Sequence, residues 1–239
     1  MHAVSVQPPI TPHQRQHALG RERGRLIVID DDPEILAALR TLFELEHYAC
    51  ETYDSALAYL QTLTDQPDQC QGPCCLLCDV RLPGLDGLEL QRRLAAHDEL
   101  PMLLMSGASG AAEAATAFRA GALDFLIKPL DDETLLEAVA KGLALSAARQ
   151  ERRHRRSELA ARLATLTRRE REVAQRVARG ERNLQIATAL GIGLRTVKRH
   201  RHQVMEKLAA KTLVDLARLL DESTRLDPDQ DDRLSDADV

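Results

Sequence analysis

The chain has 239 residues, enough for one large domain or two smaller ones. Aromatic residues make up 3% of it and Trp is absent, so a core must be built from aliphatic side chains, while five cysteines, an odd number, argue against a disulfide scaffold. Apolar runs are too short for a transmembrane helix and residues 1–25 lack the apolar core of a signal peptide, so we expect a cytoplasmic protein with no membrane partner.

The net charge of −5 conceals a strong division along the chain. Residues 1–148 contain 11 Lys and Arg against 22 Asp and Glu, whereas residues 149–220 contain 19 against 7, a net charge of +12. Residues 221–239 are acidic again. The basic stretch indicates a domain that binds a polyanion, although an arginine-rich solvated helical surface would give the same count.

Residues 26–148 alternate short apolar runs with segments of helical periodicity. The expected strands are 26–29, 49–53, 76–78, 102–105 and 123–127. The expected helices are 33–43, 56–63, 88–94, 111–120 and 133–145. Asp32 followed by Pro33 is typical of a helix start. This alternation predicts a parallel sheet of five strands with helices on both faces, and segment 64–74 is expected to be a loop.

The rest of the chain is helical in character. Residues 144–164 are rich in Arg and are expected to continue the preceding helix as a linker. Residues 166–220 contain four short helical patterns and no strand. Thr167 and Glu170 have the spacing of a capping box. Asn183 is expected to cap a short helix that ends at Leu190, and the turn 191–193 leads into a helix over 194–208, which together predict a helix-turn-helix motif.

The third helix of this region has two different faces. At about 100° per residue, an apolar stripe is predicted to be buried, formed by Val197, Val204 and Leu208. The opposite side carries long polar side chains, namely Arg195, Arg199, His202 and Glu206, with Lys198 on the flank. Such a face can reach the base edges and phosphates of DNA, although an ordinary amphipathic surface helix would look similar.

Polar side chains follow four of the five predicted strands. They are Asp30 and Asp31 after the first strand, Asp79 after the third, Ser106 after the fourth and Lys128 after the fifth. Because ligands bind at the carboxyl ends of parallel strands, we expect these groups to share one crevice. Clustered carboxylates with open positions suit Mg²⁺, and one of them could act as a nucleophile on a phosphoryl group.

Residues 26–146 resemble a response-regulator receiver domain. The matching stretches are 28–32, 77–87, 105–107 and 121–129. The resemblance implies a flavodoxin-like fold in which Asp79 is phosphorylated, and in which Ser106 and Lys128 contact the phosphoryl group. It implies Mg²⁺ ligands from Asp30, Asp31, Asp79 and the backbone carbonyl of Arg81. It also implies that Ser106 and Phe125 act as the conformational switch, and that the Lys128–Pro129 bond is cis.

Residues 166–220 resemble a LuxR-type helix-turn-helix domain. The matching stretches are 166–173, 183–187, 190–192 and 195–208. A receiver followed by this domain is the layout of the NarL/FixJ family of two-component response regulators. The DNA contacts that we expect are Asn183, Arg195, Thr196, Lys198, Arg199 and His202. Two positions depart from the family pattern: Gly193 stands where a hydroxyl residue usually caps the third helix, and Leu184 replaces a usual basic residue.

The resemblance implies a transcription regulator rather than an enzyme. Its partners would be a sensor histidine kinase, promoter DNA and RNA polymerase, and it would form a homodimer when phosphorylated. The expected divisions of the chain are a disordered segment over 1–25, a receiver over 26–146, a helical linker over 147–164, an all-α DNA-binding domain over 165–220 and an acidic disordered tail over 221–239.

Three other interpretations remain. An aspartyl phosphatase of the haloacid-dehalogenase type would need a second Asp two residues after the nucleophile, where this chain has Arg81. An RNA-binding antiterminator has no support in residues 166–220. Among the cysteines, Cys70 and Cys74 could form a redox pair, whereas Cys75 and Cys78 would lie on opposite faces of a strand, which makes them poor joint metal ligands and makes Cys78 a core residue.

Overall fold

The computed structural model describes residues 23–65, 72–94, 100–107 and 111–226. Contacts divide the chain into two units, 1–150 and 151–239. The expected disordered segment over 1–25 lies almost entirely outside the described residues, but Arg25 already belongs to the first strand. Within the described ranges, no helix is both long enough and apolar enough to cross a lipid bilayer.

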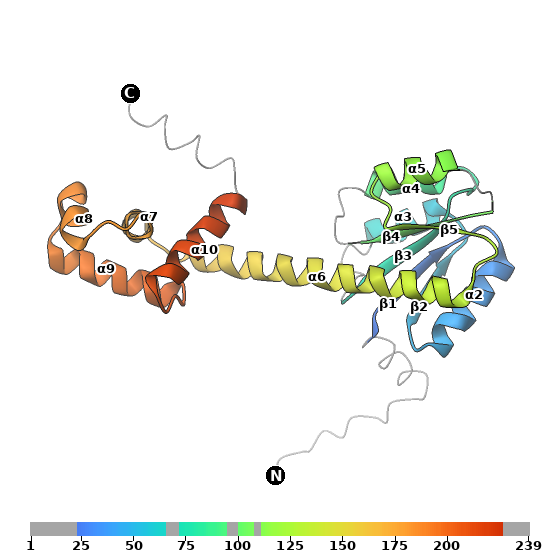
Figure 1. Ribbon diagram of the computed structural model, residues 1–239, viewed down its shortest axis with the longest axis horizontal. Coiled ribbons are helices and arrows are strands. Elements are labelled where there is room, and N and C mark those ends of the chain that lie inside the picture. The colour runs from blue at the N-terminus through green and yellow to red at the C-terminus, as the bar shows by residue number, and fades with distance from the viewer. Residues whose placement is uncertain (1–22, 66–71, 95–99, 108–110, 227–239) are drawn as a thin grey trace, which may run out of the picture. The chain divides into compact units, whose positions relative to one another are not determined.

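The first unit contains a five-stranded parallel sheet in the order β2–β1–β3–β4–β5, which confirms the predicted fold (Figure 1). The strands are β1 (Arg25–Ile29), β2 (Ala49–Tyr53), β3 (Cys74–Asp79), β4 (Met102–Ser106) and β5 (Asp124–Ile127). The strand order reverses between β1 and β3, which is where open sheets of this kind bind their ligands. The start of β3 was placed too late by the sequence, because Cys74 and Cys75 already pair with β1.

Helices cover both faces of this sheet (Figure 1). One face is covered by α2 (Pro33–Leu45) and by the first part of α6 (Asp132–Ala164). The other is covered by α3 (Ala56–Asp65), α4 (Gly87–Leu94) and α5 (Ala111–Arg119). The buried strands are apolar on both sides, so each face supports its own core, as a doubly covered parallel sheet requires. Helix α6 continues without a break through the expected linker segment.

The second unit consists of helices packed around one aliphatic core. The helices after α6 are α7 (Arg168–Ala178), α8 (Asn183–Leu190), α9 (Leu194–Lys207) and α10 (Leu213–Leu226). The core draws on all four of them, with Val173, Ile186, Val197, Val204, Leu208 and Leu216 each at most 1% exposed. Helix α10 runs to Leu226, past the boundary expected at residue 220, because the first residue that breaks helices is Pro228. The rest of the expected tail lies outside the described residues.

Local capping chemistry explains most helix starts. Asp32 accepts hydrogen bonds from the backbone amides of Glu34 and Ile35, and Pro33 is the first helical residue, as expected. Thr167 and Glu170 form the predicted capping box, with reciprocal bonds of 3.2 and 2.8 Å. The prediction that Asn183 caps α8 is wrong: Asn183 is the first residue of the helix, and the amide of the preceding residue is bonded by the side chain of Gln185.

Candidate functional site

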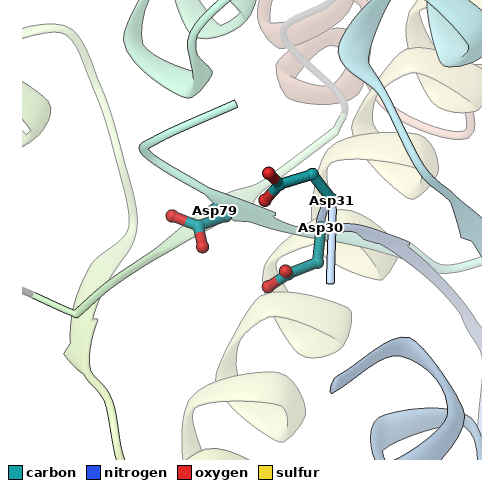
Figure 2. A group of neighbouring side chains, drawn as sticks. All are labelled: Asp30, Asp31 and Asp79. Atoms are coloured by element: carbon teal, nitrogen blue, oxygen red, sulfur yellow. The ribbon is translucent and has the colours of Figure 1, made fainter. Parts of the chain in front are cut away.

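The crevice at the carboxyl ends of the strands gathers the polar residues that the sequence places there. Figure 2 shows Asp30 and Asp31, which follow β1, facing Asp79 at the end of β3. One carboxylate oxygen from each of the three lies within 4.8 Å of the others. Asp30 and Asp79 are buried, whereas Asp31 is exposed. Because the strand order reverses between β1 and β3, the three carboxylates meet in the crevice between two neighbouring strands.

Lys128 reaches into this crevice from the end of β5. Its ammonium donates to Oδ2 of Asp30 at 2.6 Å and also donates to Oδ2 of Asp79. Burial alone would lower the pKa of Lys128, but the bonds to the two carboxylates outweigh it and raise that pKa. The pKa of Asp30 is raised because burial outweighs its bonds to Lys128 and to the Asp32 amide. The Lys128–Pro129 bond is cis, as expected.

Backbone groups fix the carboxylate of Asp79. The amide of Arg81 donates to Oδ1 of Asp79 at 2.8 Å. The loop then turns back so that Gly87 lies against the Asp79 carbonyl, where a Cβ on Gly87 would lie 2.3 Å from that oxygen. A side chain at position 87 would therefore displace the backbone that carries Asp79.

The set of donors in the crevice fits a hard divalent cation. Three carboxylates face one ammonium, so two formal negative charges in this cluster are not balanced by Lys128. Oxygen ligands with open positions suit Mg²⁺ better than a softer metal. The expected contribution of the Arg81 carbonyl stays a prediction.

A further acidic residue, Glu113, borders the crevice from α5 and is not among the residues predicted from the sequence. Ser106 is fully buried at the end of β4, and its hydroxyl donates to Oε2 of Glu113 at 3.4 Å. The other oxygen, Oε1, lies 3.5 Å from the guanidinium of Arg81. The only signal in the sequence is one acidic residue in the first turn of an alanine-rich helix.

The expected switch residue Phe125 lies in β5. It is half-buried and packs against the core on the side of α3, α4 and α5. Two apolar side chains nearby in the chain are exposed: Phe118 on α5 at 51% and Ile127 on β5 at 53%. This edge of the unit therefore presents apolar surface to its surroundings.

In the second unit, α9 presents the two faces that its periodicity predicts. Val197, Val204 and Leu208 are buried, which confirms the predicted stripe. The expected DNA contacts Arg195, Lys198, Arg199 and His202 are all exposed, and Thr196 is half-buried. The exposed surface of α9 is therefore rich in cationic and imidazole side chains, the types that contact phosphates and guanine.

The remaining predicted contact, Asn183, is occupied within the unit. Its side-chain carbonyl accepts a hydrogen bond from Arg201 of α9, which ties α8 to α9. Its role in DNA binding stays a prediction. Leu184, the departure noted in the sequence, is 65% exposed, and Gly193 caps α9 without a side-chain bond.

The three cysteines of β3 belong to the core rather than to a site. Cys74, Cys75 and Cys78 are buried in β3, which confirms the prediction for Cys78. Burial raises the pKa of Cys75 to about 12 and that of Cys78 well above the ordinary value. The proposed pairing of Cys70 with Cys74 lies partly outside the described residues.

Comparisons with known proteins agree on two domains. Residues 26–140 match the family model of the response regulator receiver domain, and residues 164–220 match that of bacterial regulatory proteins of the luxR family. The chain is 36% identical over 207 residues to the response regulator protein TmoT of Ectopseudomonas mendocina, covering 86% of this chain and 91% of the relative. It is 34% identical over 198 residues to the transcriptional regulatory protein FixJ of Bradyrhizobium diazoefficiens, covering 82% and 94%.

A solved structure extends the comparison to three dimensions. The low-resolution structure of the response regulator StyR matches with a TM-score of 0.75 and 37% identity. The match covers 83% of this chain and 98% of that one. These relatives are named as regulators rather than as enzymes.

Proposed function

Because the chain belongs to the NarL/FixJ family of two-component response regulators and is a transcription regulator, we propose that it accepts a phosphoryl group on Asp79 from a sensor histidine kinase. The observation that carries this proposal is the contact of the Lys128 ammonium with both Asp30 and Asp79. It supports Asp79 as the acceptor, since an ammonium at the reacting carboxylate can neutralise the oxygens of an arriving phosphoryl group.

The transfer follows from the chemistry of the crevice. An Oδ of Asp79 attacks phosphorus, the bond from phosphorus to the kinase imidazole breaks, and the imidazole leaves with the electron pair of that bond. Mg²⁺, held by Asp30, Asp31, Asp79 and the Arg81 carbonyl, would supply positive charge to the phosphoryl oxygens. The Lys128 ammonium then pairs with one phosphoryl oxygen, and the Ser106 hydroxyl donates a hydrogen bond to a second phosphoryl oxygen. The withdrawal of Ser106 opens the space that Phe125 enters.

Output passes to DNA through α9. The exposed Arg195, Lys198, Arg199 and His202 support an assignment in which this helix enters the major groove of promoter DNA, with Thr196 and Asn183 at its edge. Phosphorylated receivers form a homodimer, and the paired DNA-binding domains contact half-sites and RNA polymerase. The protein works in the cytoplasm, where the promoter is.

Phosphorylation is tested with a small phosphodonor. The full chain is incubated with acetyl phosphate and Mg²⁺, and the modified residue is located by mass spectrometry. The wild-type protein gains one phosphoryl group, and Asp79→Asn gains none. A control variant, Asp86→Asn, removes a carboxylate of the same loop that is not among the three clustered ones and keeps its labelling. Equal labelling of wild type and Asp79→Asn overturns the assignment of Asp79.

DNA binding is tested by the salt dependence of a gel-shift with duplex promoter DNA. Lys198→Ala removes a phosphate contact, so the slope of log affinity against log salt falls by about 0.9. Arg199→Ala lowers specific binding by roughly 1–3 kcal/mol if the residue reads a base. Lys211→Ala, which removes an exposed basic side chain outside α9, is the charge-matched control and keeps the wild-type salt slope. If Lys198→Ala and Arg199→Ala both bind DNA with unchanged affinity, the proposed face of α9 does not enter the groove.

A further inference from the structure

The carboxylate of Glu113 is placed to hold two residues of the phosphorylation crevice at once. Its Oε2 accepts the hydroxyl of buried Ser106 at 3.4 Å, and its Oε1 faces the guanidinium of Arg81 at 3.5 Å. The side chain is 33% exposed, so it lies at the border between crevice and solvent. Glu113 therefore joins β4 and the loop after β3 to the first turn of α5.

These contacts cannot all persist once Asp79 is phosphorylated. A hydroxyl has a single proton to donate, so Ser106 withdraws from Glu113 when it donates to the phosphoryl group. The phosphoryl group also adds about 1.5–2 negative charges close to the Glu113 carboxylate, and like charges repel. The guanidinium of Arg81 is then attracted by two competing anions instead of one.

We propose that Glu113 is a positioning residue that stabilises the unphosphorylated crevice by holding Ser106 and Arg81 on the side of α5. Phosphorylation has to break this arrangement, so Glu113 slows phosphorylation and shortens the lifetime of the phosphorylated state. This inference rests on the proposed function of Asp79. The first turn of α5, which carries Glu113, is therefore the part of this helix that responds to the change in charge at Asp79.

The test compares Glu113→Gln with wild type in the full chain. Labelling by acetyl phosphate with Mg²⁺ is followed in time by mass spectrometry, and decay is followed after the phosphodonor is removed. We expect labelling about three to ten times faster and a longer lifetime, since one unit of like charge and one charge-assisted hydrogen bond are lost. Glu137→Gln is the charge-matched control, because Glu137 is exposed on α6 and pairs only at the surface with Lys141.

A second background separates this role from a purely structural one. An acidic residue in the first turn also favours the dipole of α5, and loss of that effect changes thermal stability alone. In a Ser106→Ala background there is no hydroxyl to release, so the gain in rate from Glu113→Gln is expected to shrink. An equal gain in both backgrounds overturns the proposal.

The outcomes are distinguishable from failure of the proposed function. If wild type is not labelled at Asp79, the proposed function fails. If wild type is labelled and Glu113→Gln is labelled at the same rate or more slowly, only the role of Glu113 fails. A longer lifetime without faster labelling also overturns it, because that result assigns Glu113 to hydrolysis of the phosphoryl group.

Discussion

Single residues decide how closely the backbone can pack around the candidate phosphorylation site. Gly87 lies against the carbonyl of Asp79, and its neighbourhood has no space for a side chain. Gly107, next to Ser106, is the opposite case, since no described atom lies within 4 Å of where its Cβ would be. Two glycines at one crevice therefore have different structural requirements.

Replacing Gly87 with Ala is expected to destabilise the first unit by roughly 2 kcal/mol or more, because the atom in the way is a backbone oxygen that cannot rotate aside. Labelling at Asp79 should fall as well. Thermal unfolding and mass spectrometry measure the two effects. Gly107→Ala is the control for stability, and equal unfolding temperatures in the two variants would contradict this packing argument.

Glu170 is a second residue whose surroundings determine its charge. Burial by itself would raise the pKa of this carboxyl, but a hydrogen bond from Lys207 at 2.6 Å and bonds from the amide and hydroxyl of Thr167 lower it overall. Lys207 also donates to the carbonyl of Thr165 at 3.0 Å. The pair thus ties the end of α9 to the start of α7.

A lowered pKa makes the stability of the second unit depend on pH. The folded state binds its proton less readily than the unfolded state, so the contribution of Glu170 is complete above the ordinary value of 4.5 and is lost as the pH falls below it. Glu170→Gln should be less stable than wild type at neutral pH, and the difference should narrow in acid. Denaturant unfolding at several pH values measures this. A constant difference from neutral pH down to pH 3 would contradict it.

At the scale of elements, α9 begins without the N-cap side-chain bond that α2 and α7 have. Gly193 caps it with φ −68° and ψ 150°, angles that any residue adopts, and the nearest atom to a Cβ there is Oγ1 of Thr196 at 3.9 Å. By contrast, α2 and α7 start with Asp32 and Thr167, whose side chains bond to backbone amides. The first turn of α9 is therefore less firmly held than theirs.

Gly193→Ser is expected to stabilise the second unit by about 0.5–1 kcal/mol. The hydroxyl can accept an amide of the first turn, and the unfolded chain loses the freedom of glycine. Thermal unfolding followed by circular dichroism measures the gain. Gly193→Ala is the control, because it has the same effect on the unfolded chain but offers no acceptor. An equal increase in stability from Gly193→Ser and Gly193→Ala would show that the hydroxyl does not cap α9.

At the scale of the whole molecule, we expect the proposed phosphorylation to change the association of the chain. Two exposed apolar side chains lie close in the chain to the expected switch residues. Phe118 is on α5, the helix after Ser106, and Ile127 is on β5, the strand that contains Phe125. A rearrangement of Ser106 and Phe125 would alter this surface. The net charge also differs along the chain, because only residues 149–220 have an excess of basic side chains.

We expect a shift from monomer to dimer when the crevice is loaded with Mg²⁺ and beryllofluoride, a mimic of the phosphoryl group. Analytical ultracentrifugation of the full chain measures it. Two linked chains would present two copies of α9 to half-sites about one helical turn apart. The Asp79→Asn variant is the control and should not shift. The same association state with and without the mimic would contradict this mechanism, although the family assignment would stand.

The sequence predicted features that depend on neighbouring residues, and the rule that parallel strands end at one edge also predicted the cluster of Asp30, Asp79 and Lys128. It missed particular contacts between elements for which no such rule exists. Strand and helix alternation, the Asp32 cap and the capping box of Thr167 follow from local chemistry, and all are present. The early start of β3 depends on pairing with β1, and the contact of Glu113 with Ser106 joins two elements. The cap expected at Asn183 is wrong because α8 begins one residue earlier than predicted, and the side chain of Asn183 accepts instead from Arg201 of another helix.

The buried thiols of β3 allow the opening of this central strand to be measured by alkylation. Alkylating reagents attack the thiolate, and a thiol such as Cys75, with its pKa near 12 and 1% exposure, is protected from them twice, by proton affinity and by lack of access. Modification at this strand can proceed only through molecules in which the sheet has opened. Its rate at neutral pH therefore measures the free energy of opening at the strand that ends in Asp79, under conditions in which the chain is otherwise native.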